Sequence, residues 1–321
     1  GVLLVDGAGV VFNARLTCAW IFGVGGFPAW GIAGAGWATV VGTSVSALVA
    51  LILFFRKKYR EQYQTLAGWR LDRSLFRRLL YYGIPSGFTI GLEALAFSLF
   101  AIFIGRMGTV EMAATSIAFT LNLLIYLPIS GVGQAVSVIV GQNQGSNQPE
   151  IGERAAGSGL RIAWLFTFVV MGALLLMPDV LLELFRSRTN PVVWSEVAWH
   201  VPRLLFFIAA YVGFDCLHIV FSFALRGAGD TRFISMIMLT TSWPLLVIPT
   251  WFAWYCGWGL YVGWSFATGY VFFLGIVGWL RFRHAKWRTM RVIEEPSLIS
   301  ETEESDERKA TGGSPVVDPQ A

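Results

Sequence analysis

Two carboxylates deep inside apolar segments are the side chains of this sequence that most need a chemical explanation. Glu93 lies near the middle of the run Leu79–Ile104, and Asp215 lies near the middle of a second run at residues 201–225. Both runs have the length of a membrane-spanning helix. A charged side chain at the centre of a bilayer costs about 2.5–3.5 kcal/mol even on the lenient insertion scale, so such residues face a protein interior or an aqueous cavity. Both acids are therefore candidate functional residues.

Polar side chains share a helical face with the first acid. Ser86, Thr89 and Glu93 recur at i, i+3 and i+7, and this spacing places them on one side of a helix. Pro85 removes one backbone hydrogen bond just before this stripe, so a kink is predicted there.

The second acid also has polar neighbours at helical spacing. Tyr211 lies four residues before Asp215, and His218 lies three residues after it. Oxygen ligands of this kind suit a hard cation, and apolar surroundings also let a carboxylate exchange a proton near neutral pH. The alternative is a buried hydrogen-bond cluster that only fixes helix packing, and we favour it for His218 taken alone.

The composition places the whole chain in the same apolar solvent. Hydrophobic residues make up 55% of the sequence and charged residues only 14%, which is typical of a polytopic membrane protein and not of a soluble domain. Cys18, Cys216 and Cys256 lie in apolar runs without a paired cysteine or a metal-ligand spacing. We interpret them as small core residues and expect an all-α fold.

The elements that must position these side chains are membrane-spanning helices. We predict about eight of them, at residues 3–22, 35–55, 79–104, 114–139, 158–178, 201–225, 233–254 and 258–280.

The basic residues indicate the orientation of these helices. The connections 56–78, 142–161, 226–232 and 281–291 carry most of the Lys and Arg, so the positive-inside rule makes them cytoplasmic. The runs RKKYR and RFRHAKWRTMR then reflect topology and attraction to membrane lipid, not nucleic-acid binding. From residue 294 the composition changes to Glu, Ser, Thr, Gly and Pro, which predicts a largely disordered cytoplasmic tail.

An internal similarity indicates a duplicated architecture. The segment WGIAGAGWAT at Trp30–Thr39 matches WGLYVGWSFAT at Trp258–Thr268 with one insertion. Parallel repeats of this kind occur in secondary transporters, although interfacial tryptophans and membrane glycines also recur by chance. We predict the end of one lobe at residues 1–55, a basic linker at 56–78, a complete six-helix lobe at 79–283 and a tail at 284–321. The first helices of the first lobe are expected to be missing from the chain.

Three further segments resemble a known family when taken together. They are RGAGDT at Arg226–Thr231, VGQN at Val140–Asn143 after the helix that carries PISGVGQA, and GIPSGF at the start of the Glu93 helix. Their order and spacing are similar to the multidrug and toxic compound extrusion (MATE) family. The resemblance extends from about Val10 to Arg283. It implies two six-helix lobes with both termini cytoplasmic, in an integral protein of the cell membrane.

The resemblance also implies a function. Glu93, Tyr211 and Asp215 match family positions that hold a cation, so Na⁺ or H⁺ would enter there while a small cationic hydrophobic compound is exported. No other cofactor and no other metal is implied, and a monomer is expected. Further candidates for the substrate cavity follow from their polar or aromatic side chains: His218, Thr89, Asn122, Phe97 and Phe214.

Three other functions remain open. A lipid-linked oligosaccharide flippase of the same superfamily would need several Arg or Lys side chains in its cavity to hold a pyrophosphate, whereas here the mid-membrane charges are acidic. An intramembrane enzyme would need a second catalytic group beside His218, and the sequence offers none. A passive channel would dissipate an ion gradient without using it to drive a substrate uphill.

Overall fold

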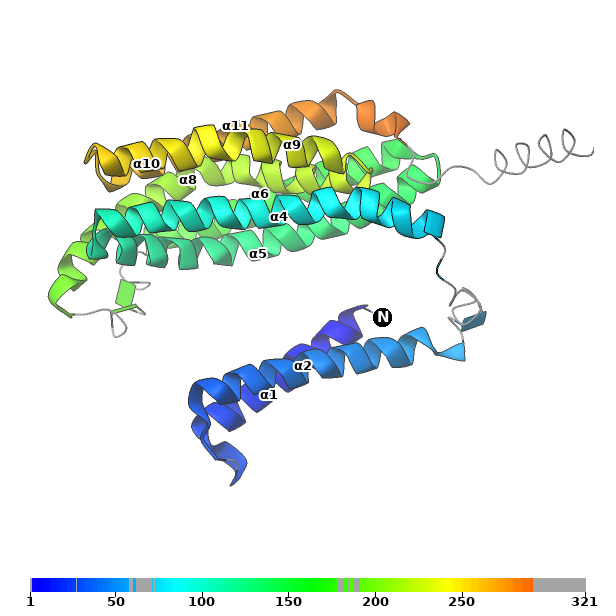
Figure 1. The fold of residues 1–321 in the computed structure, drawn as a ribbon, viewed down its shortest axis with the longest axis horizontal. Helices are drawn as coiled ribbons and strands as arrows, with labels where there is room; N and C mark the ends of the chain where they lie inside the picture. Colours follow the sequence, from blue (N-terminus) through cyan, green and yellow to red (C-terminus); the bar gives the residue numbers. More distant parts are fainter. Residues whose placement is uncertain are drawn as a thin grey trace, which may run out of the picture. The chain divides into compact units, whose positions relative to one another are not determined.

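The protein is helical throughout the part that can be described. The computed structural model describes residues 2–26, 28–57, 60–61, 71, 73–177, 182–183, 185–186 and 191–290, and these residues form helices and no strand (Figure 1). The predicted all-α class is confirmed. Most of the predicted linker at 56–78, and the tail from residue 291, lie outside the described residues.

The chain divides into two compact units, Gly1–Arg78 and Leu79–Ala321. In the first unit, α1 (Val2–Phe22) and α2 (Gly31–Phe54) pack against each other and are joined through the short 3₁₀ helix Val24–Gly26. Their backbones approach closely, because a Cβ on Gly34 would lie 2.7 Å from the carbonyl oxygen of Trp20. Small residues at such a crossing favour tight packing of apolar helices.

The second unit is a bundle of long helices (Figure 1). Its elements in chain order are α4 (Arg73–Met107, which begins within the first unit's bounds), α5 (Thr109–Gly145), α6 (Pro149–Leu176), α8 (Pro191–Gly227), α9 (Thr231–Ser242), a π-helical turn (Trp243–Val247), α10 (Ile248–Tyr255), α11 (Leu260–Arg283) and a 3₁₀ helix (Lys286–Thr289).

These helices match the predicted membrane spans. Among the described residues, seven helices are long and apolar enough to cross a membrane, and α9, the π-helical turn and α10 together make one of them. The helix α1 coincides with the remaining predicted span. Several helices extend past the predicted limits, as α5 does on both sides of 114–139, because a helix continues beyond its apolar core. The protein is an integral membrane protein.

Helix α8 lies at the centre of the second unit. It packs against α5, α6, α9 and α11, and Leu204, Ile208 and Leu225 are among its completely or almost completely buried side chains. Two glycines allow the closest approaches: a Cβ on Gly227 would lie 2.2 Å from the carbonyl oxygen of Ser137 in α5, and a Cβ on Gly275 of α11 would lie 2.4 Å from that of Phe214. The backbone of α8 is therefore fixed from two sides.

Gly227→Ala is expected to lower the free energy of unfolding by roughly 2 kcal/mol, because the added methyl group meets backbone atoms that can move only with their helix. Gly213→Ala is the matched control, since a Cβ at that position of the same helix meets nothing within 4 Å. That control should leave stability within about 0.5 kcal/mol or increase it. Thermal unfolding of both variants in detergent checks the prediction, and equal stability of the two would contradict it.

The π-helical turn interrupts the span that α9 begins. It contains Pro244, and Pro249 follows in the first turn of α10. A wide turn is one way in which neighbouring helical residues accommodate a proline.

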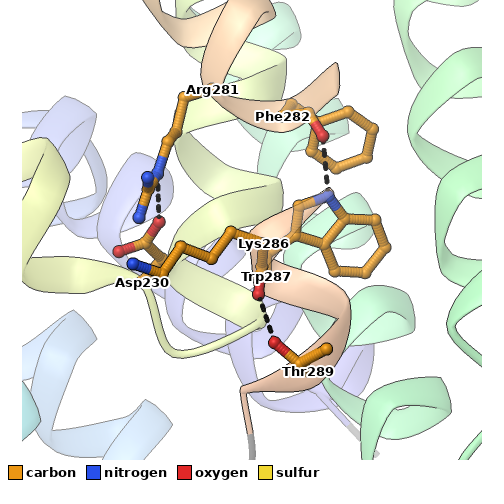
Figure 2. Close-up of polar contacts among 6 residues, drawn as sticks. All are labelled: Asp230, Arg281, Phe282, Lys286, Trp287 and Thr289. Carbon is orange, nitrogen blue, oxygen red and sulfur yellow. Dashed lines mark hydrogen bonds and ion pairs between the residues drawn. The ribbon is translucent and has the colours of Figure 1, made fainter. Parts of the chain in front are cut away.

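A short cap closes the end of the bundle at which α8 ends. We define the cap as Lys286–Met290. Trp287 is buried, its Nε1 donates to the carbonyl oxygen of Phe282, and its ring stacks on that of Phe282 (Figure 2). The side-chain amide of Gln144 in α5 lies within 3.1 Å of three cap carbonyl oxygens. The predicted tail began at residue 284, but a buried tryptophan makes its first residues part of the lobe.

An ion pair lies beside the cap. Arg281 Nε donates to Asp230 Oδ2 at 2.7 Å, joining the end of α11 to the residue that precedes α9 (Figure 2). Asp230 is 5% exposed, and the guanidinium of Arg281 also lies 4.3 Å from the ring centroid of Phe233. The carboxylate makes no side-chain capping bond to α9, because it accepts from Arg281 instead.

The two matched sequence segments adopt similar local structure. Gly31 and Gly259 both have positive φ, and each directly precedes or begins a helix. Gly34 and Gly263 then lie against neighbouring helices in their own units. The shared Trp-Gly start is consistent with a duplicated origin of the two helices.

Candidate functional site

The turn of α4 that precedes Glu93 is held against α9 by a small polar network. Thr89 is 1% exposed, and its Oγ1 lies 2.6 Å from Ser235 Oγ. Both hydroxyls donate to the carbonyl oxygen of Pro85 at 2.8 Å. Pro85 lies inside α4, as predicted. The side chain of Ser86, the third member of the predicted polar stripe, lies outside the described part.

Helix α6 fixes the rotation of α8 around Asp215. Trp164 Nε1 donates to the carbonyl oxygen of Gly213 at 3.0 Å, and Thr167 Oγ1 lies 3.3 Å from Cys216 Sγ. With α6 on this side, Tyr211 is buried and Asp215 is partly buried. Asp215 and Tyr211 interact electrostatically, as expected for residues one helical turn apart.

The two predicted acids come together in the bundle. Glu93 on α4 is partly buried, and it interacts electrostatically with Asp215 on α8. Tyr126 of α5 interacts with both carboxylates, and Tyr270 of α11 interacts with Glu93. Four helices therefore contribute oxygen-bearing side chains to one region, which we call the acidic cluster: Glu93, Tyr126, Tyr211, Asp215 and Tyr270.

The carboxylates of this cluster are not used in structural bonds. Among the described residues, no side chain or backbone group donates a hydrogen bond to Glu93 or Asp215, and no cation lies within 4.0 Å of either. This contrasts with Asp230, which is paired with Arg281. Buried charges that serve structure are normally paired, so these two acids are the candidate functional residues of the cluster.

Two neutral side-chain oxygens also lack hydrogen-bond partners among the described residues. Tyr270 Oη and Asn122 Oδ1 are buried, and neither has a hydrogen-bond partner in the described part of the chain. Native structures seldom leave such groups unsatisfied unless a ligand or function is involved. Among the residues that the structure describes, no group of three or more His, Cys, Asp and Glu side chains could hold a metal ion. Oxygen ligands of this kind suit hard cations in general.

The predicted cavity residues have different surroundings. His218 is buried, its Nδ1 lies 3.3 Å from Ser222 Oγ, and both line a small cavity that α9 and α11 also border. The ring of Phe214 packs on Phe272 at 4.4 Å between centroids, and Phe97 meets Phe119 edge to face at 6.3 Å. His218 thus has an interior hydrogen bond, and both phenylalanines have packing partners.

Comparison with known proteins identifies the family. Residues 85–252, just over half of the chain, match the family model described as MatE. The chain belongs to the MATE family. The match starts at Pro85 and includes both acids of the cluster.

Two curated MATE-type relatives illustrate the similarity. A protein of Mesorhizobium japonicum described as "Probable multidrug resistance protein NorM" is 31% identical over 231 residues, which cover 72% of this chain and 49% of the relative. The multidrug resistance protein PmpM of Pseudomonas aeruginosa is 31% identical and is covered to 48%, with 73% of this chain aligned. The chain therefore spans about half the length of the curated relatives it matches.

Solved structures share the MATE fold at lower identity. A crystal structure of MATE in the straight conformation superposes with a TM-score of 0.77 at 19% identity, covering 90% of this chain and 63% of that one. An outward-facing multidrug resistance MATE transporter gives a TM-score of 0.75 at 18% identity, with coverages of 88% and 62%. The fold of this chain is thus that of MATE transporters.

Sequence reasoning did not single out three residues that interact electrostatically with Glu93. Tyr126 and Tyr270 are single tyrosines in apolar helices, and Arg226 is the first residue of the glycine-rich cytoplasmic turn RGAGDT. Their relation to Glu93 depends on how α4, α5, α8 and α11 are placed. A search for every tyrosine well inside a predicted span would have included the first two.

Proposed function

We propose that the protein is a secondary active multidrug exporter that expels cationic amphiphilic compounds in exchange for Na⁺ or H⁺. The observation that supports this proposal is the electrostatic interaction between Glu93 and Asp215, two carboxylates on different helices of a MATE lobe that have no salt-bridge partner among the described residues. The coupling ion would bind to these acids with Tyr211 and compete with a lipophilic cation for the same negative charge. Because binding of each weakens the other, an inward ion gradient drives outward substrate movement.

The acidic character of the site favours a cation over the alternative, a lipid-linked pyrophosphate. One solved structure with this fold is titled "Reverse polarity of binding pocket suggests different function of a MOP superfamily transporter" and comes from Pyrococcus furiosus. The fold alone therefore does not decide the substrate, and the acidic side chains of the proposed site support a cation over a pyrophosphate. We propose a monomer whose basic connections and C-terminus face the cytoplasm, and no catalytic step.

Purified protein in proteoliposomes tests this function. A fluorescent lipophilic cation is expected to move uphill when a Na⁺ gradient or a proton gradient is imposed in the opposite direction, and each gradient is applied separately. The gradient that drives the movement identifies the coupling ion. Movement that only equilibrates the dye would indicate a channel, and absence of movement in both gradients would contradict the proposal.

A further inference from the structure

Arg226 is a partly buried cation that has no role in the ion exchange proposed above. It occupies the last turn of α8, and its guanidinium lies 5.4 Å from the ring centroid of Phe223. Within the described residues its side chain has no carboxylate within 4.0 Å and makes no hydrogen bond. Arg281, at the same end of the lobe, is instead fully engaged with Asp230. Arg226 is therefore free to change its partner.

Helix geometry directs Arg226 toward the acidic cluster. Tyr211, Asp215, His218, Ser222 and Arg226 follow one another at spacings of three or four residues, so they lie on one face of α8. Side chains of a helix lean toward its N-terminus. The guanidinium consequently leans from the end of α8 back toward Asp215, along a face that is polar over its whole length.

Helix α4 brings Glu93 to the same region. Thr89 and Ser235 hold α4 against the first turns of α9, directly after the turn that follows Arg226. Glu93 lies one turn beyond Thr89 on that face. In agreement with this placement, Arg226 interacts electrostatically with Glu93, with Tyr126 and with His218, although it is not in direct contact with the carboxylate.

We propose that Arg226 is a tethered cation that balances Glu93 when the coupling ion is absent and withdraws when the ion binds. This inference rests on the proposed function. Glu93 and Asp215 together carry two negative charges, and Arg226 supplies one positive charge, so a single monovalent cation completes the balance. The tethered charge weakens ion binding and therefore speeds release, since the guanidinium takes over the carboxylate that the ion leaves.

Arg226→Gln tests this role because it should change the affinity for the coupling ion and the rate of efflux in opposite directions. The purified protein should bind its coupling ion more tightly, with a half-saturating concentration of Na⁺ or H⁺ roughly tenfold lower, because an opposing charge is removed. Binding is measured as the ion-dependent rise in apparent melting temperature, once with Na⁺ at fixed pH and once as a pH series without Na⁺. The maximal rate of ion-driven efflux should fall severalfold. Arg226→Lys, which keeps the charge, should remain within about threefold of wild type in both measurements.

Two controls define the result. Arg232→Gln removes the same charge at the exposed start of α9, where the arginine lies over the ring of Tyr81, and it should leave ion affinity unchanged. In a Glu93→Gln background, Arg226→Gln should have no further effect on ion binding. Weaker ion binding in Arg226→Gln, or a result equal to Arg232→Gln, would overturn the tethered-cation role alone. Unchanged ion binding in Glu93→Gln would instead overturn the proposed ion site.

Discussion

Asp215→Asn is expected to reduce ion-driven efflux by about a hundredfold. A unit charge about 5 Å from a bound cation contributes ~3 kcal/mol at an effective dielectric constant of 20, and neutralising the carboxylate removes that attraction. Glu93→Gln should have an effect of the same order, because we place both acids in the proposed ion site. Uptake of a lipophilic cation into proteoliposomes, under the gradient that drives the wild type, measures the loss.

Stability separates this functional role from a structural one. Neither acid has a hydrogen bond or ion pair within the described residues, so removing its charge should leave the apparent melting temperature unchanged or raise it. Glu196→Gln is the matched control, since this exposed glutamate lies on α8 like Asp215. Full ion-driven efflux in both cluster variants, or loss of efflux only with loss of stability, would contradict the role assigned to the acids.

Asp230→Ala is expected to lower the free energy of unfolding by about 3 kcal/mol. The substitution leaves the largely buried guanidinium of Arg281 without its carboxylate, and breaking a buried pair in this way is costly. Glu153→Ala removes the partner of Arg288 in a pair whose side chains are 47% and 39% exposed, and it should cost less than about 1 kcal/mol. Denaturant or thermal unfolding in detergent compares the two variants.

A double variant tests whether the unpaired charge of Arg281 causes the loss of stability in Asp230→Ala. Replacing Arg281 by Met in the Asp230→Ala background removes the unpaired charge, so part of the stability should return. Equal stability of Asp230→Ala and Glu153→Ala would show that the buried pair contributes no more than the exposed one.

Some parts of this site can be predicted from sequence because charged side chains are rare inside membrane-spanning helices. Glu93 and Asp215 stand out as acids within apolar runs, and the long apolar helices that carry them follow from hydropathy alone. In the structure, the two acids interact electrostatically. Their function as an ion site remains a prediction, which the efflux measurements above address.

Other parts depend on tertiary placement that sequence does not contain. Trp287 lies in a basic segment that reads as a membrane-surface tail, yet its indole is buried against Phe282. Phe214, beside Asp215 in sequence, turns to Phe272 of α11 instead. Arg226 reads as part of a turn, and only the packing of α4 against α9 shows that it is close to Glu93. For Phe214 and Arg226, the deciding contacts are made by residues far along the chain.

The cap also constrains the order in which the lobe can be assembled. Gln144 meets its first acceptor 143 residues later in the chain, at the carbonyl oxygen of Trp287. During synthesis, the end of α5 must wait until α6, α8, α9, α10 and α11 have been made before its side-chain amide finds its acceptors. Contacts of such large sequence separation form slowly. A ribosome that stops before residue 287 would therefore leave a lobe with all its long helices but with this end open.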